Sequence, residues 1–156
     1  MESDFRTQDT WRIFRIMAEF VESIEELADV LPAVAIFGSA REKPGATRYD
    51  QTVALAKALG TAGFNIITGG GPGIMEAANK GAREAGVLSV GLGIDLPHEQ
   101  AINPYVDRGI DFRYFFVRKV MFLKYSQAVI ACPGGFGTMD ELFEIIKRAQ
   151  TRKVPR

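Results

Sequence analysis

Apolar residues near the start of the chain recur three and four positions apart. Between Thr10 and Leu27 they are Ile13, Phe14, Met17, Phe20, Val21, Ile24 and Leu27. This spacing predicts a helix over about 10–27 with one apolar face. That face would pack on the domain or on a second subunit. The polar face is acidic rather than basic, which disfavours a helix lying on a membrane surface.

After Pro32 the pattern changes to short apolar runs that alternate with helical stretches. The short runs predict buried strands over 33–37, 64–68, 87–92 and 128–132. Helical spacing predicts helices over 49–62, from 74 to about 85, over most of 113–125, and from 139 to about 148, and the polar stretch 95–108 predicts a loop. Strands alternating with helices form a parallel sheet covered on both faces. We therefore predict one α/β domain over 1–156, a Rossmann-like doubly wound parallel sheet.

The amino-acid composition excludes several classes of protein. The 156 residues are 47% hydrophobic and 24% charged with a formal net charge of zero, so neither a disordered chain nor a basic nucleic-acid binder is expected. No run approaches the roughly 20 apolar residues of a membrane span. The single cysteine, Cys132, excludes an intrachain disulfide and a cysteine-rich zinc site, and predicts a cytoplasmic location.

Two glycine-rich turns each join a predicted strand to a predicted helix, at Gly69–Gly73 and at Pro133–Thr138. Such turns lie at the carboxyl ends of parallel strands, where ligands bind, and the following helix offers free N–H groups to an anion. Either turn alone could be a tight connection. Neither is a Walker loop or a clean dinucleotide fingerprint, so a single phosphate with its sugar suits them better than a pyrophosphate.

Charged residues near these turns have two interpretations each. Arg118 and Lys119 precede the fourth predicted strand and are either site residues or a solvated basic pair. Glu141 follows the second turn and is either a functional carboxylate or a residue that stabilises the start of a helix. Cys132 is better explained as a core thiol than as a nucleophile, and His98 as a loop residue than as a general base.

The segment Pro133-Gly-Gly-Phe-Gly-Thr-Met-Asp-Glu141 resembles the P-G-G-x-G-T-x-x-E motif of the LONELY GUY (LOG) family of cytokinin riboside 5′-monophosphate phosphoribohydrolases, long labelled lysine decarboxylases. The resemblance extends to 36–41, 68–78, 96–100, 114–119 and the N-terminal segment 11–17, and it is strongest to the longer bacterial subgroup. Members of the family usually continue into a further strand and helix beyond Arg156, so the resemblance leads us to expect that this chain lacks or truncates them.

The resemblance implies an AMP-type substrate, often N6-modified, cleaved to free base and ribose 5-phosphate without a cofactor or metal. It implies Arg118 and Glu141 as the catalytic pair. It also implies a phosphate cradle of Gly134, Gly135, Gly137 and Thr138. The substrate site would be lined by Glu99 and Lys119, with a wall formed by Gly69, Gly70, Gly71, Gly73 and Met75. The family further implies a homodimer or a higher homo-oligomer, with no nucleic-acid or membrane partner.

Two other functions stay open. Molybdenum-cofactor carrier proteins share the fold and the glycine turns, so a non-catalytic nucleotide or cofactor carrier is the main alternative. The presence of both Arg118 and Glu141 favours the enzyme. A pyridoxal-phosphate lysine decarboxylase, the function in the old label, would need a lysine that forms an internal aldimine.

Overall fold

The four short apolar segments that were predicted as strands lie in one parallel sheet, together with a strand that was not predicted. The computed structural model describes residues 2–95, 102–135, 138–140, 143 and 146–147. The elements are α1 (Glu2–Glu26), β1 (Ala33–Phe37), α2 (Thr47–Thr61), β2 (Asn65–Thr68), α3 (Ile74–Ala85), β3 (Ser89–Ile94), β4 (Arg108–Phe112), α4 (Phe115–Tyr125) and β5 (Ala128–Ala131). Residues 138–140 are helical again.

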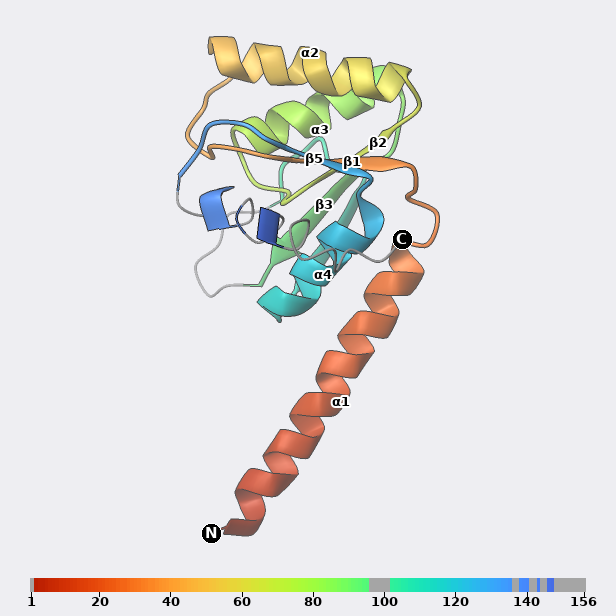
Figure 1. Cartoon of the computed structure of the whole chain (residues 1–156), viewed down its shortest axis with the longest axis vertical. Coiled ribbons are helices and arrows are strands. Elements are labelled where there is room, and N and C mark those ends of the chain that lie inside the picture. Colours follow the sequence, from red (N-terminus) through yellow and green to blue (C-terminus); the bar gives the residue numbers. More distant parts are fainter. Residues whose placement is uncertain (1, 96–101, 136–137, 141–142, 144–145, 148–156) are drawn as a thin grey trace.

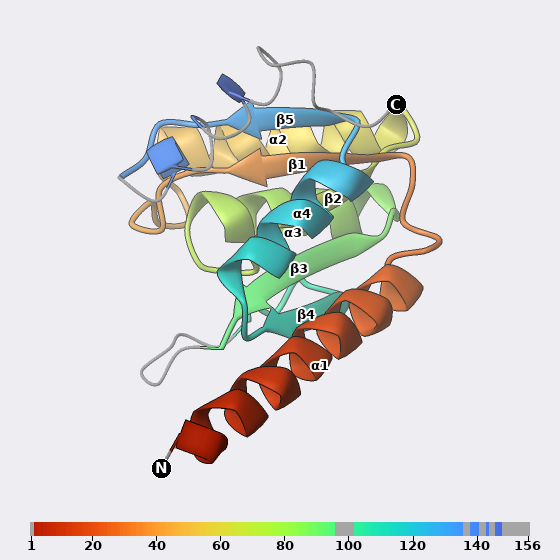
Figure 2. The same cartoon turned by 60° about the horizontal axis from the view of Figure 1, so that its bottom comes forward.

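The sheet has five strands in the order β4-β3-β2-β1-β5, all paired in parallel. The chain therefore moves outward from β1 to β4 and then returns to place β5 on the other side of β1. Helices α2 and α3 cover one face of the sheet, while α4 and the end of α1 cover the other (Figures 1 and 2). The predicted Rossmann-like α/β fold is confirmed. The strand order reverses between β1 and β5. Open α/β sheets bind ligands at such a point of reversal.

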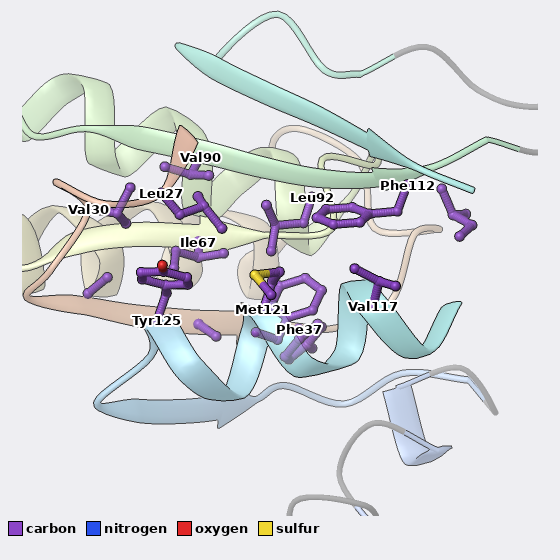
Figure 3. Close-up of a cluster of buried hydrophobic side chains, with 14 residues drawn as sticks. Leu27, Val30, Phe37, Ile67, Val90, Leu92, Phe112, Val117, Met121 and Tyr125 are labelled. Atoms are coloured by element: carbon purple, nitrogen blue, oxygen red, sulfur yellow. The ribbon is translucent and has the colours of Figure 1, made fainter. Parts of the chain in front are cut away.

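The core lies on both sides of the sheet. On the α4 side, Met121 and Tyr125 pack against Phe37 and Ile67 of the strands, and Leu27 from the end of α1 completes this cluster (Figure 3). On the other side, the buried residues of α3 pack on those of β1 and β2. Burial of these side chains stabilises the layers by about 1.5–3 kcal/mol for each large residue.

Two strand predictions were wrong in detail. The predicted loop 95–108 ends in a strand, β4, that extends to Phe112 and was not predicted. Gly109 and Asp111 face solvent in β4, so this edge strand has no continuous apolar run. The final strand was predicted to be buried, yet Ala128 and Ala131 are exposed because β5 lies at the other edge of the sheet.

Helix α1 also differs from its prediction. It begins at Glu2 rather than near Thr10, and it projects away from the domain (Figure 1). Only the side that carries Ile16, Phe20 and Leu27 contacts the core. The other predicted face residues are exposed: Ile13 58%, Phe14 56%, Met17 55%, Val21 56% and Ile24 40%. Among the described helices, none is long and apolar enough to cross a membrane.

Candidate functional site

Three turns meet at the carboxyl edge of the sheet, and Ser39 joins them. Ser39 follows β1, and its N–H donates to the carbonyl of Pro133 at 3.2 Å, in the turn after β5. The Ser39 carbonyl accepts a hydrogen bond from the N–H of Ile74 at 3.0 Å, at the start of α3. Gly73 precedes that helix with a φ of 73°, and a Cβ there would collide with the Ser39 carbonyl oxygen. Only glycine fits at this position, so the close approach of the turns depends on it.

A cavity of about 680 Å³ opens beside these turns. The described residues that line it are Phe37, Gly38, Ser39, Ala40, Arg41, Met75, Phe115, Arg118, Gly134, Gly135, Thr138 and Asp140. Its volume lies in the range of small-molecule sites. The cavity is bordered by the turns that follow β1 and β5, so it lies at the point where the strand order reverses.

Contacts with β3 and α4 hold the side chain of Arg118 at the wall of the cavity. From α4, its Nε donates to the Leu92 carbonyl of β3 at 2.7 Å. Its guanidinium carbon lies 5.2 Å from the ring centroid of Phe122 and 5.9 Å from that of Phe115. Both distances allow cation–π attraction. Several contacts therefore fix this one cationic side chain at the cavity wall.

The turn Gly69–Gly73 lies behind two of the lining side chains. Its glycines are absent from the described lining of the cavity. A Cβ on Gly69 would lie 2.7 Å from a terminal nitrogen of Arg118 and 2.9 Å from the sulfur of Met75. A Cβ on Gly71 would lie 2.7 Å from the Met75 methyl carbon. The turn thus sets where Arg118 and Met75 can lie.

The turn after β5 faces the cavity directly. Gly134, Gly135 and Thr138 line it, and the N–H of Met139 donates to the carbonyl of Gly135 at 3.2 Å as helical structure begins. Backbone N–H groups at such a helix start are suited to an anion. Asp140 lies at the same edge, where its carboxylate accepts a hydrogen bond from Lys119 Nζ at 2.8 Å. Lys119 is therefore ion-paired beside the cavity.

Five of the predicted site residues line this one cavity: Met75, Arg118, Gly134, Gly135 and Thr138. Lys119 and the predicted glycines of the turn Gly69–Gly73 are not in its described lining. Glu141, Gly137 and Glu99 lie outside the described residues. The prediction omitted the turn Gly38–Arg41, which contributes Arg41 as a second cationic side chain of the lining. Its position directly after a buried strand, like that of the two glycine turns, is the signal that would have found it.

The chain is similar to known proteins in sequence and in fold. A model of the family described as "Possible lysine decarboxylase" matches residues 75–156, more than half of the chain. The chain belongs to this family. Several of its curated relatives bear the LOG name, as the motif predicted. The cytokinin riboside 5′-monophosphate phosphoribohydrolase LOG of Oryza sativa is 34% identical over 120 residues, which cover 72% of this chain and 47% of the relative.

Other relatives of this LOG-family chain fall into two groups. A probable cytokinin riboside 5′-monophosphate phosphoribohydrolase of Arabidopsis thaliana is 28% identical, over 76% of the chain and 60% of the relative. The solved structure of the molybdenum cofactor carrier protein of Chlamydomonas reinhardtii is 27% identical with a TM-score of 0.63, over 76% of this chain and 72% of that one. The chain spans about half the length of the first curated relatives it matches.

Proposed function

We propose that this LOG-family chain hydrolyses the N-glycosidic bond of AMP-type nucleoside 5′-monophosphates, including N6-modified cytokinin forms. One observation carries the proposal: Arg118 lines the same cavity as Gly134, Gly135 and Thr138, at the reversal of the strand order. The names of the plant relatives support the same chemistry. The products are the free base and ribose 5-phosphate.

The cavity is suited to a phosphorylated ligand. Arg41 and Arg118 supply positive charge, and the glycine turn after β5 supplies backbone N–H groups. The only described carboxylate of the lining, that of Asp140, is paired with Lys119. A 5′-phosphate at the Gly134–Thr138 turn would receive charge-assisted hydrogen bonds. Phe115 and Met75 offer apolar surface for the base.

The mechanism follows from the bond that breaks. Water adds to the anomeric carbon of the ribose while the bond to the base nitrogen breaks, and the base leaves with a proton. Positive oxocarbenium character develops at that carbon, as in glycoside hydrolysis. By its place in the family motif, Glu141 stabilises this charge and orients or deprotonates the water. Arg118 positions Glu141 and the ribose phosphate, or assists departure of the base.

The test is a product assay. The chain is mixed with AMP, N6-isopentenyl-AMP, GMP and CMP, and free base and ribose 5-phosphate are measured by chromatography. We expect release from the adenine nucleotides and loss of at least about a hundredfold in kcat in Arg118→Ala. Arg113→Ala is the control, because Arg113 is exposed just before α4 and is absent from the described cavity lining. No base release from any of the four nucleotides contradicts the proposal.

A carrier function is the second candidate. The molybdenum cofactor carrier protein of Chlamydomonas reinhardtii and the molybdenum cofactor binding protein of Rippkaea orientalis have TM-scores of 0.63 and 0.60 to this chain. A carrier would bind a nucleotide-like ligand in the same cavity without releasing a base. Ligand binding together with intact AMP would favour it. The decarboxylase of the family description would instead show the absorption band of bound pyridoxal phosphate.

We also propose a homodimer formed through α1. The exposed stripe of this helix consists of Ile13, Phe14, Met17, Val21 and Ile24. A contiguous apolar surface of this kind marks an interaction site on a protein of ordinary composition. A second copy offers the same stripe, as a two-fold interface requires. The cytoplasmic location stays the prediction made from the single cysteine.

A further inference from the structure

A buried polar network lies behind the turn Gly69–Gly73, and Asn103 is its connection to that turn. Asn103 is 6% exposed and comes from the segment between β3 and β4. Its side-chain Nδ2 lies 3.1 Å from the carbonyl oxygen of Gly70 and 3.0 Å from that of Gly71. Its backbone N–H also donates to the Gly70 carbonyl, at 2.8 Å. One residue thus holds two successive carbonyls of the turn.

The rest of the network fixes the orientation of this amide. Asn103 Nδ2 also lies 3.0 Å from Oδ1 of Asn79, and Asn103 Oδ1 accepts a hydrogen bond from the N–H of Tyr105 at 3.1 Å. Asn79 Oδ1 accepts a second hydrogen bond from the hydroxyl of Thr68, at 2.7 Å. That hydroxyl accepts one from the N–H of Gly70 at 2.9 Å. Because these groups are buried and paired, a change at one of them leaves another unsatisfied.

The turn Gly69–Gly73 connects this hydrogen-bond network to the cavity. Gly69 is close enough to Arg118 and Met75 that a single added Cβ would lie within 3 Å of both. Both of these side chains line the cavity. A shift of Gly70 and Gly71 would therefore move the surface against which Arg118 rests.

We propose that Asn103 is a positioning residue: it sets the turn Gly69–Gly73, and through it the guanidinium of Arg118, for the reaction. This inference rests on the proposed function for its kinetic part only. Asn103 itself is not among the described residues that line the cavity. Its effect is expected in turnover rather than in nucleotide affinity, since a small misplacement of a reacting group can cost up to about a hundredfold in rate.

The chain offers a matched control at the opposite end of β2. Asn65 also bridges backbone groups with its side-chain amide, donating to the Val30 carbonyl at 2.8 Å and accepting from the N–H of Leu88 at 3.0 Å. It lies at the start of the strand whose end leads into the glycine turn. Asn65→Ala and Asn103→Ala therefore remove similar hydrogen bonds, but only Asn103→Ala does so beside the site.

The experiment measures AMP hydrolysis, thermal unfolding and amide hydrogen exchange for the wild type and both variants. Both variants should melt at a lower temperature. Only Asn103→Ala should lower kcat, by about tenfold or more with KM changed less than about threefold, measured well below its melting temperature. Only Asn103→Ala should speed exchange in the peptide that contains residues 69–75. If Asn103→Ala does not fold, Asn103→Ser and Asn65→Ser take the place of the alanine pair.

The outcomes separate this inference from the proposed function. Equal kcat values for both variants and the wild type, with only melting affected, would overturn the positioning role. Absence of base release by the wild type contradicts the proposed function instead. The exchange data then decide the role of Asn103: faster exchange at 69–75 confined to its variant supports it, and wild-type exchange there overturns it.

Discussion

Lys119 and Asp140 form an ion pair, with Nζ 2.8 Å from Oδ2, that joins α4 to the residues after the second glycine turn. Each is the sequence neighbour of a candidate catalytic residue, Arg118 on one side and Glu141 on the other. The Lys119 side chain is 17% exposed, whereas that of Asp140 is 69% exposed. The pair therefore connects the two segments that carry the candidate catalytic residues, while it remains partly open to solvent.

The first prediction concerns this pair. Lys119→Met and Asp140→Asn should each lower kcat/KM by about three- to tenfold, and the double variant should lose little more, because either change breaks the same contact. The stability cost should stay below about 1 kcal/mol, as for other exposed pairs. A double-mutant cycle on AMP hydrolysis measures the coupling. Strictly additive losses would mean that the two side chains act separately.

A second prediction tests Glu141. Glu141→Gln keeps the size of the side chain but removes its charge, so kcat should fall at least about a hundredfold, roughly 2.7 kcal/mol. KM should change little, because the charge acts mainly in the transition state.

The controls for Glu141 are its neighbour and that neighbour's partner. Asp140→Asn also removes a carboxylate near the helix start, but it breaks the ion pair as well. Lys119→Met also breaks the pair but keeps the Asp140 carboxylate, so comparing the two variants separates loss of the ion pair from loss of a helix-start charge. Near-normal turnover in Glu141→Gln, with lower heat stability only, would leave Glu141 a helix-start residue and favour the carrier function.

The third prediction concerns the phosphate. If the turn Gly134–Thr138 binds the 5′-phosphate, adenosine should be a far poorer substrate than AMP. Loss of these charge-assisted hydrogen bonds should cost about 3 kcal/mol or more, roughly a hundredfold in kcat/KM. Steady-state assays of both compounds measure this ratio. Similar values for adenosine and AMP would refute the phosphate cradle.

The sequence predicted most of the fold because the buried strands have a strong signal. β1 is a continuous apolar run and β2 has two fully buried isoleucines at its centre, and each strand is followed by a turn whose glycines mark a close approach. The edge strand β4 was missed because polar residues alternate with apolar ones and Gly109 weakens the pattern. The spacing of apolar residues correctly predicted that α1 has an apolar face. Helical spacing alone does not say whether the domain or a partner covers that face.

The residues of the candidate site that belong to sequence motifs could be predicted. A residue that acts through hydrogen bonds to backbone groups could not. Arg118, Gly134 and Thr138 belong to segments that resemble a family, and they line one cavity. Asn103 gave no signal, because its partners are the carbonyls of Gly70 and Gly71, which every residue type possesses. Only the folded chain shows that a polar residue in a connecting segment bonds to a turn more than thirty positions earlier.

A fourth prediction tests the α1 stripe. Val21→Glu places a charge in its centre and should yield a monomer, because burial of an unpaired carboxylate is unfavourable. Arg15→Gln is the control, since it changes the net charge by the same amount at another exposed position of α1. Light scattering at micromolar concentration measures the mass. A monomeric wild type, or two variants that dissociate alike, would contradict the dimer.

The last prediction concerns stability in alkali. Tyr49 is 1% exposed, and its hydroxyl donates to Glu76 Oε1 at 2.9 Å, so it joins α2 to α3. Burial, followed by this hydrogen bond to a carboxylate, raises the pKa of Tyr49 above its ordinary value of 10.0. As the pH rises, the Tyr49 hydroxyl therefore ionises at a lower pH in the unfolded chain than in the folded chain. The contribution of Tyr49 is fully present below pH 10 and is lost as the pH rises above it, with a slope of up to about 1.4 kcal/mol per pH unit.

Tyr49→Phe removes both the hydroxyl and its titration. At pH 8 the variant should be about 1 kcal/mol less stable than the wild type, because it lacks the hydrogen bond to Glu76. Between pH 10 and pH 11 its free energy of unfolding should fall less steeply, so the two curves should converge. Urea unfolding at several pH values measures both, and the effects of lysines and of Tyr125 cancel in the difference. Curves that stay parallel above pH 10 would show that Tyr49 ionises equally readily in the folded and unfolded chain.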